Sequence, residues 1–371
     1  MHEQEPSSTK GASPNLGTQV PGSKPVKTTI AGTLALLLVG LILFLPTNFV
    51  VRTPGPVLNT LGEYEGKELI TIDGAKSFQS NSILDMTTIY VQGGGQNRVS
   101  TPVILEALFN PNKDIVPEET MIPRGVTSEE RGAANDSMMV SSQELSIAAA
   151  MNELGHEYST WLEVADFSTD TNRDSLKPGD RLLGFEGKPV SNLEDLKADL
   201  NERGDQPSTM TVRRASGEGE PKETEVSVTT SANAEGSRQL GVYLSTAFDF
   251  PIDVKFGVEE VGGPSAGMMF ALAIIDRLTE GSLAGENHIA GTGEITAEGK
   301  VGPIGGIAQK MVAAKADGAT VFLAPSENCS DVQGRVPNGL HVVKVGTLHE
   351  ARQALTKIEQ GADPTTLESC S

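Results

Sequence analysis

An uncharged apolar run near the N-terminus constrains this chain of 371 residues more than any other feature. From Ile30 to Val51 no charged residue occurs, and the densest part reads LALLLVGLILFL. About 20 apolar residues suffice to cross a bilayer, so the run predicts a transmembrane helix over residues 30–51. A cleaved signal peptide would end in small residues of the A-x-A type, but PTNFVV follows, which favours an uncleaved anchor. A buried core helix is the weaker alternative.

The charges on either side of the run predict its orientation. Lys24 and Lys27 lie just before it, whereas only Arg52 follows closely. The positive-inside rule therefore places the N-terminus in the cytoplasm and the rest of the chain outside. Residues 1–29 are rich in Ser, Thr, Pro, Gly and Gln, which predicts a disordered cytoplasmic tail. The sequence thus indicates a single-pass protein of the cell membrane with an extracellular body.

The charge balance and the cysteine count exclude several classes of protein. With 29 basic and 49 acidic residues the net charge is −20, so the chain would bind phosphate backbones poorly and nucleic acid is not expected as a partner. No GxxxxGK[ST] motif occurs, which excludes the usual P-loop ATPase. Two cysteines exclude a disulfide-dense scaffold and a four-cysteine zinc site. Outside the cell, Cys329 and Cys370 could form a disulfide that ties down the C-terminal residues; two unpaired thiols are nearly as well supported.

After the apolar run, short apolar stretches alternate with turn residues. The stretches at 68–72 and 82–91 predict strands, and three glycines end the second. Residues 142–154 keep apolar positions at helical spacing up to Gly155, so a helix is expected there. From composition alone, residues 53–150 would form a separate β-rich domain.

The sequence pattern changes over residues 156–233, which contain the run LKPGDRLLGFEGKPVSNLEDLKADL. Its end predicts a helix with Leu193, Leu196 and Leu200 on one face, so the segment is a small β-rich module. The run resembles PDZ domains, which add an extended peptide to a sheet edge and hold its C-terminal carboxylate on backbone amides. Gly241 in LGVYL could supply that carboxylate loop in a permuted arrangement; a purely structural insert is the alternative.

The motif GGPSAG at residues 262–267 precedes the nearly all-apolar run MMFALAIIDRL. A helix that is apolar all round is normally buried. Ser265 then lies at a helix start, where free amides converge and the dipole is positive, a place that can stabilise an oxyanion. The commoner use of serine at this position is a helix cap, so these residues alone leave both interpretations open.

A second helix is predicted over residues 305–318, ended by Gly318. Lys310 falls on its apolar stripe, whereas Lys315, five positions on, points towards water. A desolvated lysine has a lowered pKa and can act as a neutral general base. A lysine that extends its amine to solvent is the alternative, and taken alone it is favoured.

Three motifs occur in order: GGPSAGMMFALAI, GTGEITAEGKVGPIGG and GGIAQKMVAAKADGATVFLAP. Together they closely resemble the proteolytic domain of Lon proteases, the Ser–Lys peptidases. The resemblance implies that Ser265 is the nucleophile, that Lys310 is the general base and that the Thr292 hydroxyl supports the lysine. The amides around the serine would hold the oxyanion, in a loop formed by Gly263, Pro264, Ala266 and Gly267. The sequence departs from cytosolic Lon at Gly262, where an acidic residue is common.

The layout of anchor, PDZ-like module and Lon-like domain resembles the YlbL-like membrane proteins of Gram-positive bacteria. This resemblance implies an α+β fold in which the module is inserted into the Lon-like domain. The sequence MMVSSQ at 138–143 weakly resembles a Lon helix motif, with the matching residues at Met139 and Ser142. The predicted organisation is a tail (1–29), a transmembrane helix (30–51), a first part of the Lon-like domain (52–155), a PDZ-like module (156–233), the Lon-like domain (234–350) and a C-terminal tail (351–371).

The favoured function is an ATP-independent, membrane-anchored serine endopeptidase of the cell envelope. Its partners would be protein or peptide substrates, bound through their C-termini by the module, and a homo-oligomer is implied because Lon-type domains usually form rings. No cofactor and no metal are expected, since the five histidines form no HExxH pair. A Ser–His–Asp triad built from His288 or His341 is a remote alternative. The main rival function is a non-catalytic PDZ scaffold with a relic Lon-like domain, and a cytosolic protease subunit with a separate ATPase partner is a third.

Overall fold

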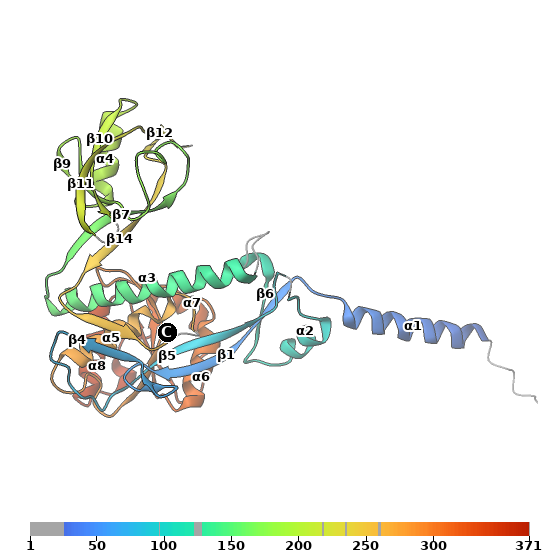
Figure 1. Ribbon diagram of the computed structural model, residues 1–371. Coiled ribbons are helices and arrows are strands. Elements are labelled where there is room, and N and C mark those ends of the chain that lie inside the picture. Colours follow the sequence, from blue (N-terminus) through green and yellow to red (C-terminus); the bar gives the residue numbers. More distant parts are fainter. Residues whose placement is uncertain are drawn as a thin grey trace, which may run out of the picture.

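The computed structural model describes residues 26–95, 97–121, 128–216, 219–233, 236–258 and 261–370. The fold is mixed α+β, as predicted, with two six-stranded sheets, here called the body sheet and the module sheet, that each pack against a hydrophobic core of their own. Figure 1 shows the module sheet standing apart at the top of the view and the larger body below it.

The N-terminal helix α1 spans Val26–Phe44. Among the residues that the structure describes, no helix combines the length and the hydrophobicity needed to cross a bilayer. The predicted transmembrane helix over 30–51 is therefore not supported. Its predicted C-terminal end at residue 51 is also wrong, because Phe49–Val51 begin strand β1 (Phe49–Asn59), in which Val50 and Val51 are fully buried. Pro46 cannot continue a helix, and β-branched valines suit a strand. Of the predicted tail over 1–29, residues 1–25 lie outside the described residues.

The body sheet joins strands from both halves of the chain. Its spatial order is β20 (His341–Val345), β19 (Val321–Pro325), β16 (His288–Gly291), β5 (Ile83–Gln92), β1 (Phe49–Asn59) and β6 (Asp114–Pro117). Strands β20, β19, β16 and β5 run parallel, and β1 and β6 add antiparallel pairs at the other edge. Composition had suggested a separate domain over 53–150, and this is wrong because β1 and β5 share a sheet with β16.

Helices cover both faces of this sheet. On one face, α3 (Ser128–Leu154), α5 (Gly267–Leu278) and α8 (Leu348–Glu359) share a core with Leu84 and Met86 of β5. On the other face, α6 (Ile307–Asp317) and α7 (Cys329–Val332) pack with Phe322 and Ala324 of β19. Because successive side chains of a strand point to opposite faces, β16 contributes to both cores, with Ile289 in the first and Ala290 in the second.

Helix α5 lies at the centre of the first core. Every residue from Gly267 to Arg277 is buried, as its all-apolar sequence predicts. The predicted helix over 142–154 is the C-terminal half of α3, which begins already at Ser128. The remaining short elements are α2 (Thr101–Leu108), β2 (Glu63–Tyr64), β3 (Lys67–Glu68), β4 (Ile70–Asp73) paired with β15 (Asp253–Phe256), and β17 (Glu294–Ile295) paired with β18 (Val301–Gly302).

The module sheet belongs to a module that we define as residues 159–249. Its order is β11 (Gly219–Val228), β10 (Ser208–Ser216), β8 (Arg181–Phe185), β7 (Ser159–Phe167) and β14 (Val242–Asp249), with β9 (Lys188–Pro189) beside β8 and the pair β12 (Ser231–Ala232) and β13 (Arg238–Gln239). Helix α4 (Leu193–Arg203) packs Leu196 and Leu200 into its core. The predicted boundary at residue 233 is wrong, because β14 pairs with β7 along its length, from Val242 with Phe167 to Asp249 with Ser159.

The C-terminal residues are folded onto the body, so the predicted tail over 351–371 is also wrong. Residues up to Glu359 continue α8, whose buried positions repeat at helical spacing: Leu348, Ala351, Leu355 and Ile358. Thr347 caps this helix by accepting a hydrogen bond from the Glu350 amide. A disulfide joins Cys370 to Cys329 of α7, and Cys370 is buried in the core beneath α6.

Candidate active site

Ser265 lies in a short 3-10 turn, η2 (Pro264–Ala266), that leads directly into α5. Proline is favoured at the first position of a helix because its fixed φ suits the turn and its missing N–H is not needed there. Gly263 precedes it with φ +90°, a conformation that side chains rarely allow. The sequence Gly-Pro-Ser therefore sets a sharp turn that presents the serine at the start of a rigid, buried helix.

Helix α3 holds this turn in place from the other side. The Asn135 carbonyl accepts a hydrogen bond from the Gly263 amide at 3.0 Å, and the Ser142 hydroxyl donates to the Pro264 carbonyl at 3.0 Å. A Cβ at Gly262 would come within 2.9 Å of the Asn135 Cβ. Asn135 thus occupies the space that any side chain at position 262 would need.

The four glycine, proline and alanine positions predicted around Ser265 have different roles. The amides of Gly263 and Gly267 already donate to the carbonyls of Asn135 and Pro264, and Pro264 has no N–H. A Cβ at Gly267 would lie 2.7 Å from the Ser142 hydroxyl, so α3 and α5 meet closely there. The amides of Ser265 and Ala266 are the remaining candidates for an oxyanion site.

Lys310 reaches Ser265 from helix α6. Only 2% of the residue is exposed, and its Nζ lies 2.8 Å from the Ser265 Oγ and 2.8 Å from the Thr292 Oγ1. Thr292 follows β16 and is itself buried. Three residues separated widely in sequence therefore meet through hydrogen bonds inside the protein, with the serine as the most accessible member.

Thr292 also fixes the backbone of the serine. Its hydroxyl donates to the Ser265 carbonyl at 2.9 Å, and the Gly293 amide donates to the same carbonyl at 2.8 Å. The Thr292 oxygen can at the same time accept from the lysine amine, since a hydroxyl donates one hydrogen bond and accepts others. The residue thus positions both the amine and the serine.

Burial lowers the pKa of Lys310 from 10.5 to about 7. Desolvation disfavours the ammonium form, and within the described chain no carboxylate forms an ion pair with this amine to offset it. An uncharged amine near pH 7 can accept the proton of a hydroxyl at hydrogen-bond distance. The site can therefore generate a serine alkoxide nucleophile.

A pocket of about 190 Å³ opens beside the turn, between α3 and β17. It is lined by Ser137, Met138, Ser141, Ser142, Leu145, Pro264, Glu294 and Ile295. Burial raises the pKa of Glu294 above its usual range. The pocket is mostly apolar apart from serine hydroxyls and this carboxyl, and it touches the residue immediately before Ser265.

The two histidines considered for a Ser–His–Asp triad, His288 and His341, lie elsewhere. His288 contacts Asp85 and Asp317 at the end of β16 that is far from Thr292. The side chain that contacts the Ser265 hydroxyl is Lys310, and not His288 or His341. Sequence reasoning missed Asn135, because α3 begins in a polar stretch without apolar periodicity. It also missed the His288 group, the one set of described side chains whose spacing could hold a metal ion.

Comparison with known families agrees with this geometry. Residues 223–357 match the family described as Lon protease (S16) C-terminal proteolytic domain. The Lon protease of Roseiflexus castenholzii is 42% identical over 101 residues, which cover 26% of this chain and 12% of the relative. The Lon protease of Rhizobium meliloti is 36% identical over 105 residues, covering 28% of this chain and 13% of the relative. The similarity supports a serine peptidase domain, although the chain spans only about an eighth of the length of these relatives.

Among solved structures, the PDZ domain of an SdrC-like protein from Listeria monocytogenes is similar to part of the chain. The match covers 23% of this chain and 86% of that domain, with 15% identity and a TM-score of 0.20. A TM-score this low leaves the fold of the module to be judged from its own topology.

Proposed function

We propose that this protein is a serine endopeptidase in which Ser265 is the nucleophile and Lys310 the general base. The observation that carries the proposal is the Lys310 amine, buried, with a pKa near 7 and 2.8 Å from the Ser265 hydroxyl. A structural lysine would be expected to pair with a carboxylate or to extend to solvent. The similarity of residues 223–357 to the Lon proteolytic domain supports the same assignment.

In this mechanism the neutral amine of Lys310 takes the proton of the Ser265 hydroxyl as its oxygen attacks a peptide carbonyl. The tetrahedral oxyanion accepts hydrogen bonds from the amides of Ser265 and Ala266. The Lys310 ammonium then gives its proton to the leaving amine, and an acyl-enzyme ester forms on Ser265. Water, deprotonated by the same lysine, hydrolyses the ester and restores the site.

Thr292 prepares the site for these steps. Its hydrogen bonds to the Lys310 amine and to the Ser265 carbonyl fix the distance between base and nucleophile before substrate arrives. Such preorganisation lowers the barrier because the groups need little rearrangement during the reaction. The pocket beside Pro264 is the place where we expect a substrate side chain to lie.

We propose that the module recruits substrate chains. Strand β14 lies at the edge of the module sheet, and Gly241 immediately precedes it with φ +73°. An edge strand can pair with an extended peptide, and a glycine turn at its start exposes backbone amides to a terminal carboxylate. The chain has no P-loop motif, so the proposed activity is independent of ATP and restricted to unfolded or flexible substrates.

We place the activity outside the cytoplasm. The disulfide between Cys329 and Cys370 supports this location, because structural disulfides persist in oxidising compartments and are rare in the cytosol of mesophiles.

A fluorophosphonate probe tests the proposal directly. The wild-type protein should be labelled covalently at Ser265, and labelling should disappear in Ser265→Ala and fall strongly in Lys310→Arg. Ser330→Ala, an exposed serine of α7 outside the pocket, is the matched control and should be labelled like wild type. If the folded wild-type protein is not labelled and cleaves no unstructured peptide, the rival interpretation as a non-catalytic scaffold is correct.

A further inference from the structure

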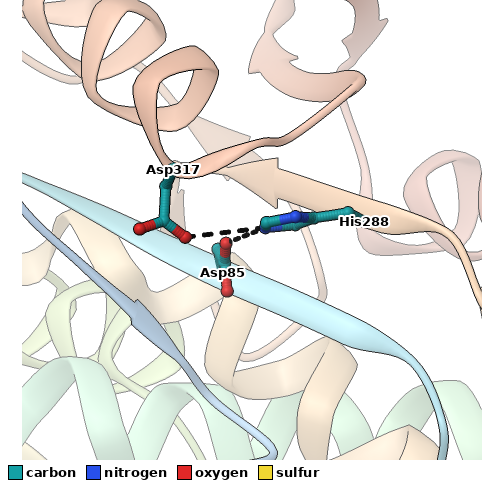
Figure 2. A group of neighbouring side chains, drawn as sticks. All are labelled: Asp85, His288 and Asp317. Carbon is teal, nitrogen blue, oxygen red and sulfur yellow. Dashed lines mark hydrogen bonds and ion pairs between the residues drawn. The ribbon is translucent and has the colours of Figure 1, made fainter.

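A cluster of three ionisable side chains lies away from the proposed active site. Asp85 comes from β5, His288 is the first residue of β16 and Asp317 is the last residue of α6. Figure 2 shows the three side chains converging, with the His288 ring facing both carboxylates. One ligand atom from each residue lies within 4.8 Å of the other two.

The fold brings these residues together from distant parts of the sequence. Alternation along β5 directs Asp85 to the face covered by α6, the same face from which Thr87 donates to the Gly291 carbonyl at 3.1 Å. Gly318 ends α6 with φ +105°, and a Cβ at this position would lie 3.5 Å from the His288 Nδ1, so the end of α6 places Asp317 beside the histidine. The cluster is therefore fixed by secondary structure on all three sides.

The negative charge of this cluster is poorly balanced. Asp85 is 1% exposed, and His288 is its ion-pair partner. Within the described ranges, no lysine or arginine forms an ion pair with Asp85 or Asp317. Asp317 also lies at the C-terminal end of α6, where the helix dipole disfavours a carboxylate. Burial and the nearby Asp317 both raise the pKa of Asp85, against the opposing effect of His288.

We propose that Asp85, His288 and Asp317 bind one divalent transition-metal ion of the Zn²⁺ type. The ion would lie between the His288 Nε2 and one oxygen of each carboxylate. It would replace the hydrogen bond between His288 and Asp85 and balance the charge of the two carboxylates.

The donor set determines the class of metal. One imidazole nitrogen with two carboxylate oxygens suits Zn²⁺, Co²⁺ or Mn²⁺, whereas Mg²⁺ and Ca²⁺ prefer oxygen ligands alone and Cu⁺ prefers sulfur. The His288 Nε2 lies 3.8 Å from the Asp317 oxygen, a spacing that two ligands of one ion about 2.1 Å from each can reach with small movements. Half of the Asp317 side chain is exposed, so ions can enter from solvent and water can complete the coordination.

The site ties together the two elements that carry the proposed catalytic lysine and its partner. Strand β16 runs from His288 to Gly291, directly before Thr292, and α6 carries Lys310 and ends at Asp317. A bound ion would clamp the far ends of both elements, so its binding should stabilise the domain.

The test uses tag-free full-length protein, first stripped with a chelator. Wild-type protein should bind one equivalent of Co²⁺ with visible d–d absorption, and Zn²⁺ should displace the Co²⁺ and raise the melting temperature. Asp317→Asn, at a half-exposed position where folding should be preserved, should weaken binding about tenfold or more. His288→Gln should abolish the Co²⁺ absorption. Asp174→Asn and His156→Gln, exposed residues outside the cluster, should behave like wild type.

The proposal is overturned if folded wild-type protein binds no Co²⁺ or Zn²⁺ at micromolar concentrations, which would mean that a proton alone bridges His288 and Asp85. It is equally overturned if Asp317→Asn and His288→Gln bind the ion as tightly as wild type. Both variants change residues that are not fully buried, so both should fold. Circular dichroism of each variant verifies its folding before metal binding is measured. Loss of binding in both folded variants, with the two controls intact, supports the site.

Discussion

Lys310 and Lys315 belong to one helix, α6, but their amines end in opposite environments. The Lys310 amine is enclosed between the hydroxyls of Ser265 and Thr292, whereas the Lys315 amine donates to the Gly339 carbonyl at 2.8 Å near the surface. Burial lowers the pKa of Lys310 to about 7. The side of α6 on which a lysine lies, and not the residue type, therefore determines which lysine can act as a base.

This contrast predicts the effect of replacing each lysine by arginine. Lys310→Arg should reduce peptide hydrolysis by about a thousandfold or more, because a guanidinium stays protonated and cannot accept the serine proton. Lys315→Arg keeps a donor for the Gly339 carbonyl and should retain nearly full activity. Turnover of a fluorogenic unstructured peptide measures both. Equal losses in the two variants, with both folded, would remove Lys310 from the mechanism.

The pH dependence of activity follows from the lowered pKa of Lys310. The amine is the active form when neutral, so kcat/KM should rise about tenfold per pH unit below pH 7 and level off above it. A lysine with an ordinary pKa would instead give activity that keeps rising towards about pH 10. A pH profile of kcat/KM on a peptide without ionisable side chains distinguishes the two.

The same lowered pKa predicts a cost to stability. Below about pH 7 both the folded and the unfolded protein carry a charged Lys310, and the folded state bears the full penalty of burying it, about 5 kcal/mol. Between pH 7 and 10.5 the unfolded state binds the extra proton, so the free energy of unfolding rises with pH and the penalty disappears. Lys310→Met should therefore stabilise the fold by about 3 kcal/mol more at about pH 6.5 than at about pH 9.5. Urea unfolding at the two pH values measures this difference, and a pH-independent effect would contradict it.

Local patterns in the sequence predicted the parts of the site that depend on one element at a time. The apolar run after Ser265 predicted a buried helix, and the apolar stripe of α6 placed Lys310 on the core-facing side. That stripe alone favoured an amine extended to solvent, and only the resemblance to Lon reversed this preference. The resemblance to Lon added Thr292, whose position after β16 no periodicity indicates. What sequence could not supply was Asn135, because its role depends on how closely α3 approaches Gly262 and Gly263.

Non-local pairing explains the errors in the fold. Strand β14 was assigned to the wrong domain because its partner β7 lies far upstream, and nothing within Val242–Asp249 reveals that pairing. Val50 and Val51 extended the apparent N-terminal helix because apolarity alone does not separate the end of a helix from a buried strand. The cluster of Asp85 and His288 joins residues 203 positions apart, a contact visible only in three dimensions.

Removing the disulfide should destabilise the body without changing the site. The bond closes a segment with a sequence separation of 41, for which chain entropy predicts about 4 kcal/mol. Cys329→Ser/Cys370→Ser should therefore melt at a lower temperature than wild type, and a reducing agent should lower the melting temperature of the wild type to the same value. The variant itself should not respond to reductant. A wild-type melting temperature unchanged by complete reduction would contradict this.

Excising the module tests whether the body folds and works alone. The ends of the module meet, because Ser159 and Asp249 are paired residues of β7 and β14. Replacing residues 159–249 with a short glycine-serine linker should leave the larger core intact and retain hydrolysis of a short unstructured peptide, while cleavage of a protein substrate through its C-terminus falls. The matched control removes residues 156–233, which leaves β14 without β7 and exposes its apolar side chains, so this variant should aggregate. Loss of peptide hydrolysis in a soluble, folded 159–249 excision would show that the module completes or gates the site, and would overturn its assignment to recruitment alone.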